Sequence, residues 1–193
     1  MKKEYFSIPN LMGYFRILMI PVFLYLYYKA DTPRDYGVAF LVLAISLLTD
    51  LFDGWIARKF NMITDFGKAL DPIADKLTQG ALAIAVSFRY RFMLIFLALF
   101  VCKEMYMGIM GLYLKKKKNF WTGAKMYGKV CTTIIDVGAF VLLLLPGLSY
   151  TAANTLIVVM MIFMCYSLIR YILFHMSVLR EKEPTEKASI FNS

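Results

Sequence analysis

Cysteine and histidine are scarce in this chain of 193 residues, which has three cysteines and one histidine. Cys102, Cys131 and Cys165 each lie inside an apolar stretch, where a reduced cysteine behaves as a small apolar residue. We therefore expect neither a disulfide framework nor a metal site built from cysteine. His175 stands alone near the end of the last apolar stretch, and we expect it at a membrane interface rather than as a ligand.

Charge is also scarce, because 18% of the residues are charged whereas 60% are hydrophobic and the mean hydropathy is +0.62. One soluble core of this size cannot bury so much apolar surface, so a lipid bilayer is the expected solvent. The net charge of +9 does not indicate nucleic-acid binding, because the basic residues lie between apolar runs. An anionic membrane surface is the expected partner. Residues 1–8 lack a short apolar core with a cleavage site, so we expect no cleaved signal peptide.

Long apolar runs dominate the rest of the chain. A bilayer crossing takes roughly 20 apolar residues, and backbone groups in hydrocarbon must bond internally. We predict an all-α integral membrane protein with six transmembrane helices and a cavity open to the cytoplasm. Residues 1–179 are expected to be the transmembrane domain, which begins with a short interfacial segment over residues 1–8, and residues 180–193 a polar cytoplasmic tail. The expected helices cover residues 8–28, 38–56, 68–88, 92–114, 127–145 and 152–174.

Lysine and arginine collect in alternate loops, which predicts the orientation of the chain. Arg89 and Arg91 are exceptions, because their loop would lie on the side of the membrane opposite to the other basic loops. Both termini are expected in the cytoplasm, as an even number of crossings requires, and the membrane is expected to be the cell inner (plasma) membrane. The residues expected on the cytoplasmic side are Lys2, Lys3, Arg58, Lys59, Lys115 to Lys118, Arg180 and Lys182.

Four aspartates interrupt the apolar pattern. Asp50 and Asp53 lie three residues apart near the end of the second expected helix, and Asp71 and Asp75 lie four apart near the start of the third. Each pair shares one helical face, and a short connection lets the cytoplasmic ends of the two helices face each other. A helix cap could explain one of them alone, as for Asp71 before Pro72. Four aspartates at or inside membrane helices, where a charge is energetically costly, predict a functional cluster.

Such a cluster repels itself unless cations neutralise it. Magnesium fits, because it binds a few carboxylates together with substrate phosphate oxygens, and manganese is an alternative. Four carboxylates suit two ions, which can clamp a phosphoryl centre. Gly54, Ala57 and Gly67 keep the nearby helix surfaces free of bulk, and Arg58 offers a planar fork for a phosphate.

These residues resemble the signature of the CDP-alcohol phosphotransferase family, which reads D-x-x-D-G-x-x-A-R, eight residues, then G-x-x-x-D-x-x-x-D. The resemblance implies a six-helix membrane enzyme, a CDP-activated lipid substrate and a homodimer. Every fixed position matches, at Asp50, Asp53, Gly54, Ala57, Arg58, Gly67, Asp71 and Asp75.

The same resemblance implies a division of roles. Asp50, Asp53 and Asp71 would hold one ion, and Asp50, Asp71 and Asp75 the other. Asp75 would also be the catalytic base that deprotonates the acceptor hydroxyl, after which CMP leaves. The positions expected to bind the CDP-lipid are Gly54, Ala57, Arg58, Thr64 and Gly67.

The acceptor is suggested by two further runs, Ile8–Phe23 and Ile63–Lys76, which are similar to bacterial phosphatidylglycerophosphate synthases of this family. Those enzymes transfer a phosphatidyl group from CDP-diacylglycerol to sn-glycerol 3-phosphate in phospholipid biosynthesis. One stretch departs from their G-K-x-K-T, because Cys131 stands in place of the second lysine. Cardiolipin synthase, which uses phosphatidylglycerol, and the phosphatidylinositol phosphate and phosphatidylserine synthases therefore stay open. The candidates for binding the acceptor phosphate are Lys125, Lys129, Arg170 and Arg16.

A different class of function is a divalent-cation transporter or channel. A transport route needs polar residues through the full depth of the membrane, along several helices. Here the ionisable groups gather at the expected cytoplasmic ends, which favours an enzyme.

Overall fold

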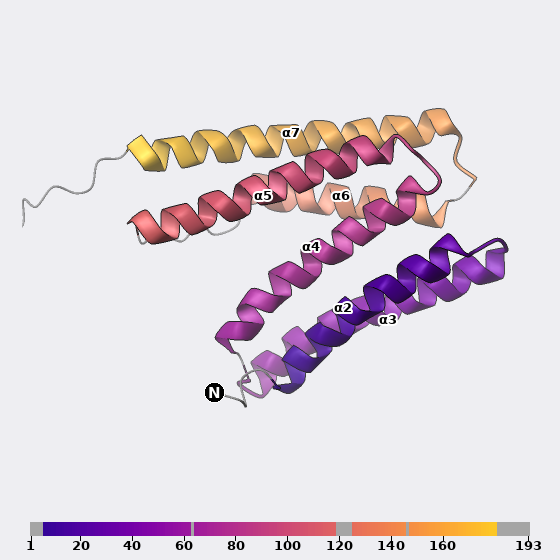
Figure 1. The fold of residues 1–193 in the computed structure, drawn as a ribbon, viewed down its shortest axis with the longest axis horizontal. Coiled ribbons are helices and arrows are strands. Elements are labelled where there is room, and N and C mark those ends of the chain that lie inside the picture. The colour runs from indigo at the N-terminus through magenta and orange to yellow at the C-terminus, as the bar shows by residue number, and fades with distance from the viewer. Residues whose placement is uncertain (1–5, 63, 119–124, 146, 181–193) are drawn as a thin grey trace, which may run out of the picture. The chain divides into compact units, whose positions relative to one another are not determined.

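The computed structural model describes residues 6–62, 64–118, 125–145 and 147–180. All regular elements in these residues are α-helices (Figure 1). The chain divides at Leu94 into two units, of which the first holds α2 to α4 and the second holds nearly all of α5 and all of α6 and α7. The helices are α2 (Ile8–Tyr28), α3 (Pro33–Lys59), α4 (Asp65–Ser87), α5 (Met93–Lys118), α6 (Met126–Leu144) and α7 (Tyr150–Arg180).

Local sequence signals set the ends of the helices that carry the aspartates. Thr32 and Asp35 form a capping box at the start of α3, so this helix begins before the apolar run. After α3 ends, Asn61 adopts φ 52°, a left-handed conformation that asparagine tolerates and that turns the chain. Thr64 then caps α4, since its hydroxyl accepts a hydrogen bond from the backbone N–H of Gly67 at 2.9 Å.

In the first unit, α2 packs against both α3 and α4 (Figure 1). Gly13 of α2 permits the close approach to α4, because a Cβ at this position would lie 2.8 Å from a methyl carbon of Leu70. Towards the other end of α2, the buried ring of Tyr27 makes edge contacts with Tyr36 and Phe40 of α3. Helix α2 is thus the packing partner that α3 and α4 share.

In the second unit, α6 packs against α7. Gly138 of α6 faces Met160 of α7, and a Cβ at Gly138 would lie 2.5 Å from the sulfur. Helix α5 reaches α7 through Tyr106, whose Oη lies 3.3 Å from Nδ1 of His175. The His175 side chain is 1% exposed, so it lies inside the helix packing. Its position at a membrane interface stays a prediction.

Five of the six described helices, all except α4, are long and apolar enough to cross a membrane. Their surfaces expose many large apolar side chains, including Leu41, Leu112 and Ile162. The chain is therefore an all-α, multi-pass membrane protein, as the sequence predicts. Helix α4 differs because its first half is charged, and its crossing stays a prediction. The charged residues of α4 are Asp65, Lys68, Asp71, Asp75 and Lys76.

The predicted helix ranges correspond one by one to the six helices. Residues 8–28 match α2, whereas α3 and α7 extend beyond the predicted ranges 38–56 and 152–174. The capping box at the start of α3 and the basic residues in the last turn of α3 and of α7 favour these longer helices. Residues 1–5 and 181–193 lie outside the described residues, so the interfacial segment, the polar tail and the boundary at residue 179 stay predictions.

Candidate functional site

Three of the four aspartates gather around one arginine of α2. The guanidinium of Arg16 pairs with Asp50 and Asp53 of α3 through the same nitrogen, Nη2, which lies 2.5 Å from Asp53 Oδ2. Its other terminal nitrogen, Nη1, donates to Asp75 Oδ1 of α4 at 3.1 Å. The two helices that carry the aspartates therefore do bring carboxylates to a common point, but they do so through a third helix.

The carboxylates around Arg16 differ in accessibility. The side chain of Arg16 is 1% exposed and that of Asp53 is 6% exposed. Asp50 is 39% exposed and Asp75 is 57% exposed. Asp53 thus lies inside the helix packing, whereas Asp75 presents the most accessible carboxylate of the three.

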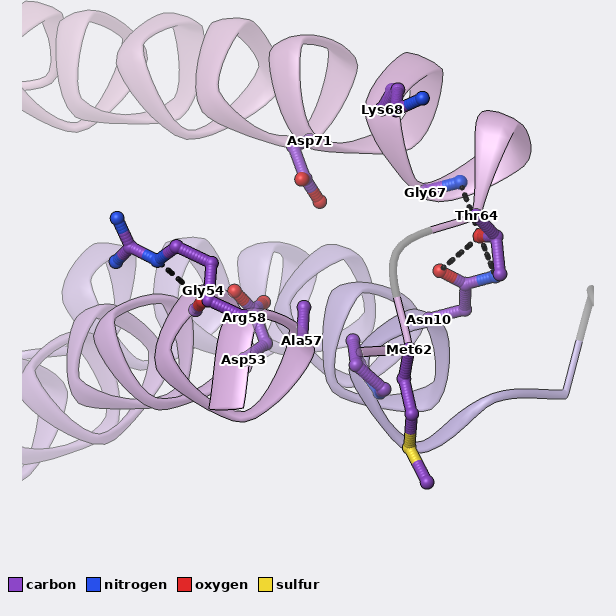
Figure 2. A pocket seen from close by; sticks show the side chains of 11 residues that line it. Asn10, Asp53, Gly54, Ala57, Arg58, Met62, Thr64, Gly67, Lys68 and Asp71 are labelled. Carbon is purple, nitrogen blue, oxygen red and sulfur yellow. Dashed lines mark hydrogen bonds between the residues drawn. The ribbon is translucent and has the colours of Figure 1, made fainter. Parts of the chain in front are cut away.

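The fourth aspartate, Asp71, lines a pocket of about 220 Å³ that all three helices of the first unit form. Figure 2 shows Asp71 of α4 and Asp53 of α3 on opposite sides of this pocket. The pocket lies beside the Arg16 cluster, because Asp53 belongs to both. Its lining residues are Pro9, Asn10, Asp53, Gly54, Ala57, Arg58, Met62, Thr64, Gly67, Lys68 and Asp71.

All five residues that the sequence analysis assigns to the CDP-lipid line this pocket. The smallest of them, Gly54 and Ala57, lie one turn apart on α3 (Figure 2). Arg58 donates from Nε to the backbone carbonyl of Gly54 at 2.9 Å, which leaves its terminal nitrogens available for an anion. The assignment of these side chains to the CDP-lipid stays a prediction.

Asn10 of α2 is a site residue that the sequence analysis missed. Its side-chain amide donates to Thr64 Oγ1 at 3.1 Å, next to the cap of α4 (Figure 2). Asn10 is 3% exposed, and a Cβ at Gly67 would lie 2.7 Å from its Oδ1. The sequence held only a weak signal, a polar side chain directly after Pro9 at the start of a long apolar run, because a polar side chain that becomes buried there needs a partner.

The donor chemistry of the aspartates fits a hard divalent cation, since every ligand candidate is a carboxylate oxygen. In the described part of the chain, no group of three or more histidine, cysteine, aspartate or glutamate side chains is arranged to hold a metal ion. Three of the carboxylates instead pair with the guanidinium of Arg16. Arg16 thus supplies a positive charge among these carboxylates, and the binding of divalent ions by them stays a prediction.

The acceptor-phosphate candidates fall in different parts of the chain. Arg16 lies in the first unit, within the aspartate cluster. Lys125 and Arg170 lie in the second unit, and each contacts an aromatic ring. Lys125 Nζ is 4.2 Å from the ring centre of Phe174, and the Arg170 guanidinium is 5.5 Å from the ring centre of Tyr127. The fourth candidate, Lys129 of α6, is exposed. Binding of an acceptor phosphate by these residues stays a prediction.

Comparisons with known proteins agree with the signature. The family model described as CDP-alcohol phosphatidyltransferase matches residues 6–173. Among curated relatives, a CDP-diacylglycerol–glycerol-3-phosphate 3-phosphatidyltransferase of Rickettsia typhi is 47% identical over 79 residues, which are 40% of this chain and 43% of the relative. The protein of the same name from Escherichia coli K12 is 38% identical over 85 residues, which are 44% of this chain and 46% of the relative. The chain thus spans less than half the length of these relatives. Because the family model covers most of the chain, the chain belongs to the CDP-alcohol phosphatidyltransferase family.

Proposed function

We propose that this protein transfers a phosphatidyl group from CDP-diacylglycerol to sn-glycerol 3-phosphate and releases phosphatidylglycerophosphate and CMP. The observation that carries the proposal is the meeting of carboxylates from α3 and α4 beside a pocket lined by the other signature residues. The names of the relatives from Rickettsia typhi and Escherichia coli support this choice of donor and acceptor.

Asp75 is the proposed general base. Among the carboxylates paired with Arg16 it is the most exposed, so an acceptor hydroxyl can approach it. Its carboxylate takes the proton of the acceptor hydroxyl, whose oxygen forms a bond to the β-phosphorus of the CDP-lipid. The bond from that phosphorus to the CMP oxygen breaks, and CMP leaves with the electron pair.

The other signature residues bind and orient the donor. Gly54 and Ala57 leave room for the nucleotide, and the terminal nitrogens of Arg58 would donate hydrogen bonds to the diphosphate. Asp50, Asp53, Asp71 and Asp75 would hold two magnesium ions, which supply charge neutralisation at the diphosphate; manganese is an alternative. Lys125, Lys129 and Arg170 are proposed to bind the phosphate of the acceptor.

The cellular setting follows from the apolar helices and the positions of the basic residues. The protein is proposed to lie in the cell inner (plasma) membrane, surrounded by its lipids, with both termini in the cytoplasm. A homodimer and the absence of a nucleic-acid partner complete the proposal, and the homodimer rests on the family resemblance alone.

The test is CMP release by the purified protein in detergent with CDP-diacylglycerol and Mg²⁺. Four acceptors are supplied separately: sn-glycerol 3-phosphate, phosphatidylglycerol, inositol phosphate and serine. Release with sn-glycerol 3-phosphate alone is the expected result. Release with another acceptor alone would replace the proposed acceptor, with phosphatidylglycerol indicating a cardiolipin synthase. Absence of release with every acceptor, together with divalent-cation flux in liposomes, would favour the transporter.

A further inference from the structure

We infer that Arg16 is an internal counter-cation of the aspartate cluster, and that it competes with divalent cations for the same carboxylates. This inference rests on the proposed function, because it concerns the carboxylates proposed to hold the ions. It adds a positioning residue that lies outside the signature and contributes no metal ligand.

The contacts of Arg16 are those of a counter-cation. Both of its terminal nitrogens are used by carboxylates, Nη2 by Asp50 and Asp53 and Nη1 by Asp75. In the described residues, Nε has no hydrogen-bond partner. A free phosphate would therefore find the two terminal nitrogens of the fork already occupied.

Burial makes the pairing mutually dependent. Arg16 is 1% exposed, and an unpaired buried guanidinium is costly. In the same way, neighbouring carboxylates without a cation repel one another in a low dielectric. The guanidinium thus holds the carboxylates of α3 and α4 together before any ion arrives.

Competition follows from the shared carboxylates. Arg16 contacts one oxygen each of Asp50, Asp53 and Asp75, so an ion bound by the same carboxylates would lie close to the buried guanidinium, and the two cations would repel each other. Binding of the ions therefore weakens the contacts of the guanidinium with these carboxylates. The measured affinity for the ion is reduced by the cost of breaking these contacts.

The test compares Arg16→Gln with the wild type by calorimetric titration of Mn²⁺ into the metal-free protein in detergent. The variant is expected to bind the first ion with a Kd at least about tenfold lower, equivalent to about 1.4 kcal/mol. Without metal its melting temperature should be lower than that of the wild type, and Mn²⁺ should raise it by more. Arg34→Gln is the matched control, because Arg34 is an exposed arginine of the same unit, and it should change neither quantity.

Arg16→Lys keeps one positive charge but loses the fork, so its Kd should fall between those of the wild type and Arg16→Gln. It also serves as the folding-competent variant if Arg16→Gln cannot be purified. An unchanged or weaker affinity in both variants, with a wild type that binds Mn²⁺ and releases CMP, would overturn the inference alone. A wild type that neither binds Mn²⁺ nor releases CMP would overturn the proposed function.

Discussion

The close approach of Gly67 to Asn10 predicts that a larger residue at position 67 disturbs the packing of α4 against α2. In Gly67→Ala, the new Cβ would lie 2.7 Å from Asn10 Oδ1 and 3.0 Å from Thr64 Oγ1. The first distance is 0.7 Å shorter than the 3.4 Å at which ordinary contact begins. Asn10 is 3% exposed and hydrogen-bonded to Thr64, so neither atom can move away without loss.

The expected cost combines two effects. Overpacking of a tight site costs about 1–3 kcal/mol, and weakening the hydrogen bond between Asn10 and Thr64 costs about 1 kcal/mol. Together they come to about 3 kcal/mol, which lowers the melting temperature of a protein of this size by roughly 6–12 °C. Because Gly67 and Thr64 line the pocket, the KM for CDP-diacylglycerol should rise as well.

Thermal unfolding in detergent, followed by far-ultraviolet circular dichroism, measures the first effect. Gly37→Ala is the matched control, since a Cβ at that helical position meets nothing within 4 Å, and its melting temperature should stay equal or rise slightly. Asn10→Ala removes the clashing oxygen, so the loss in the double variant should be smaller than the sum of the two single losses. Additive losses, or a Gly67→Ala variant as stable as the wild type, would refute the argument.

Three other substitutions test the site and the second unit. Asp75→Asn should abolish CMP release but keep CDP-diacylglycerol binding, measured by calorimetry, and normal release would exclude Asp75 as the base. Asp71 is not among the carboxylates that Arg16 contacts in the described residues, so Asp71→Asn should weaken Mn²⁺ binding without lowering the metal-free melting temperature; retention of two full-affinity sites would remove Asp71 from the proposed ligands. Gly138→Ala should lower the melting temperature, because its Cβ would lie 2.5 Å from the Met160 sulfur, and overpacking costs about 1–3 kcal/mol. Gly111→Ala, with nothing within 4 Å, is the control, and an equal effect in both variants would contradict the packing argument.

The sequence predicts the local features of this protein well. Apolar run lengths give all six helices, because a membrane span has a narrow range of lengths. The three- and four-residue spacings of the aspartates give shared helical faces, because the helical period alone determines them. These features depend only on residues near each other in the chain.

The sequence could not show which helix completes the cluster. Arg16 lies 34 residues before Asp50, and no periodicity links the two positions. An arginine at this position suits a phosphate, as the acceptor-phosphate prediction assumes, but its planar fork suits a carboxylate equally well. The useful signal was a balance of charge, because an arginine inside an apolar helix needs an anion, and the four aspartates are carboxylates that likewise interrupt the apolar pattern.

The three buried residues Asn10, Gly13 and Arg16 explain how α2 can serve both neighbouring helices. A step of three residues turns an α-helix by about 300°, so this row drifts by about 60° with each step while rising about 4.5 Å. Asn10 and Gly13 meet Thr64 and Leu70, at the cap and in the early turns of α4. Arg16, further round the helix, reaches Asp75 of α4 as well as both aspartates of α3. Helix α4 is thus attached to α2 at points about 9 Å apart along the α2 axis, which fixes its rotation as well as its position. Substitutions on this row of α2 should therefore alter the alignment of the α4 carboxylates even though α2 itself supplies none.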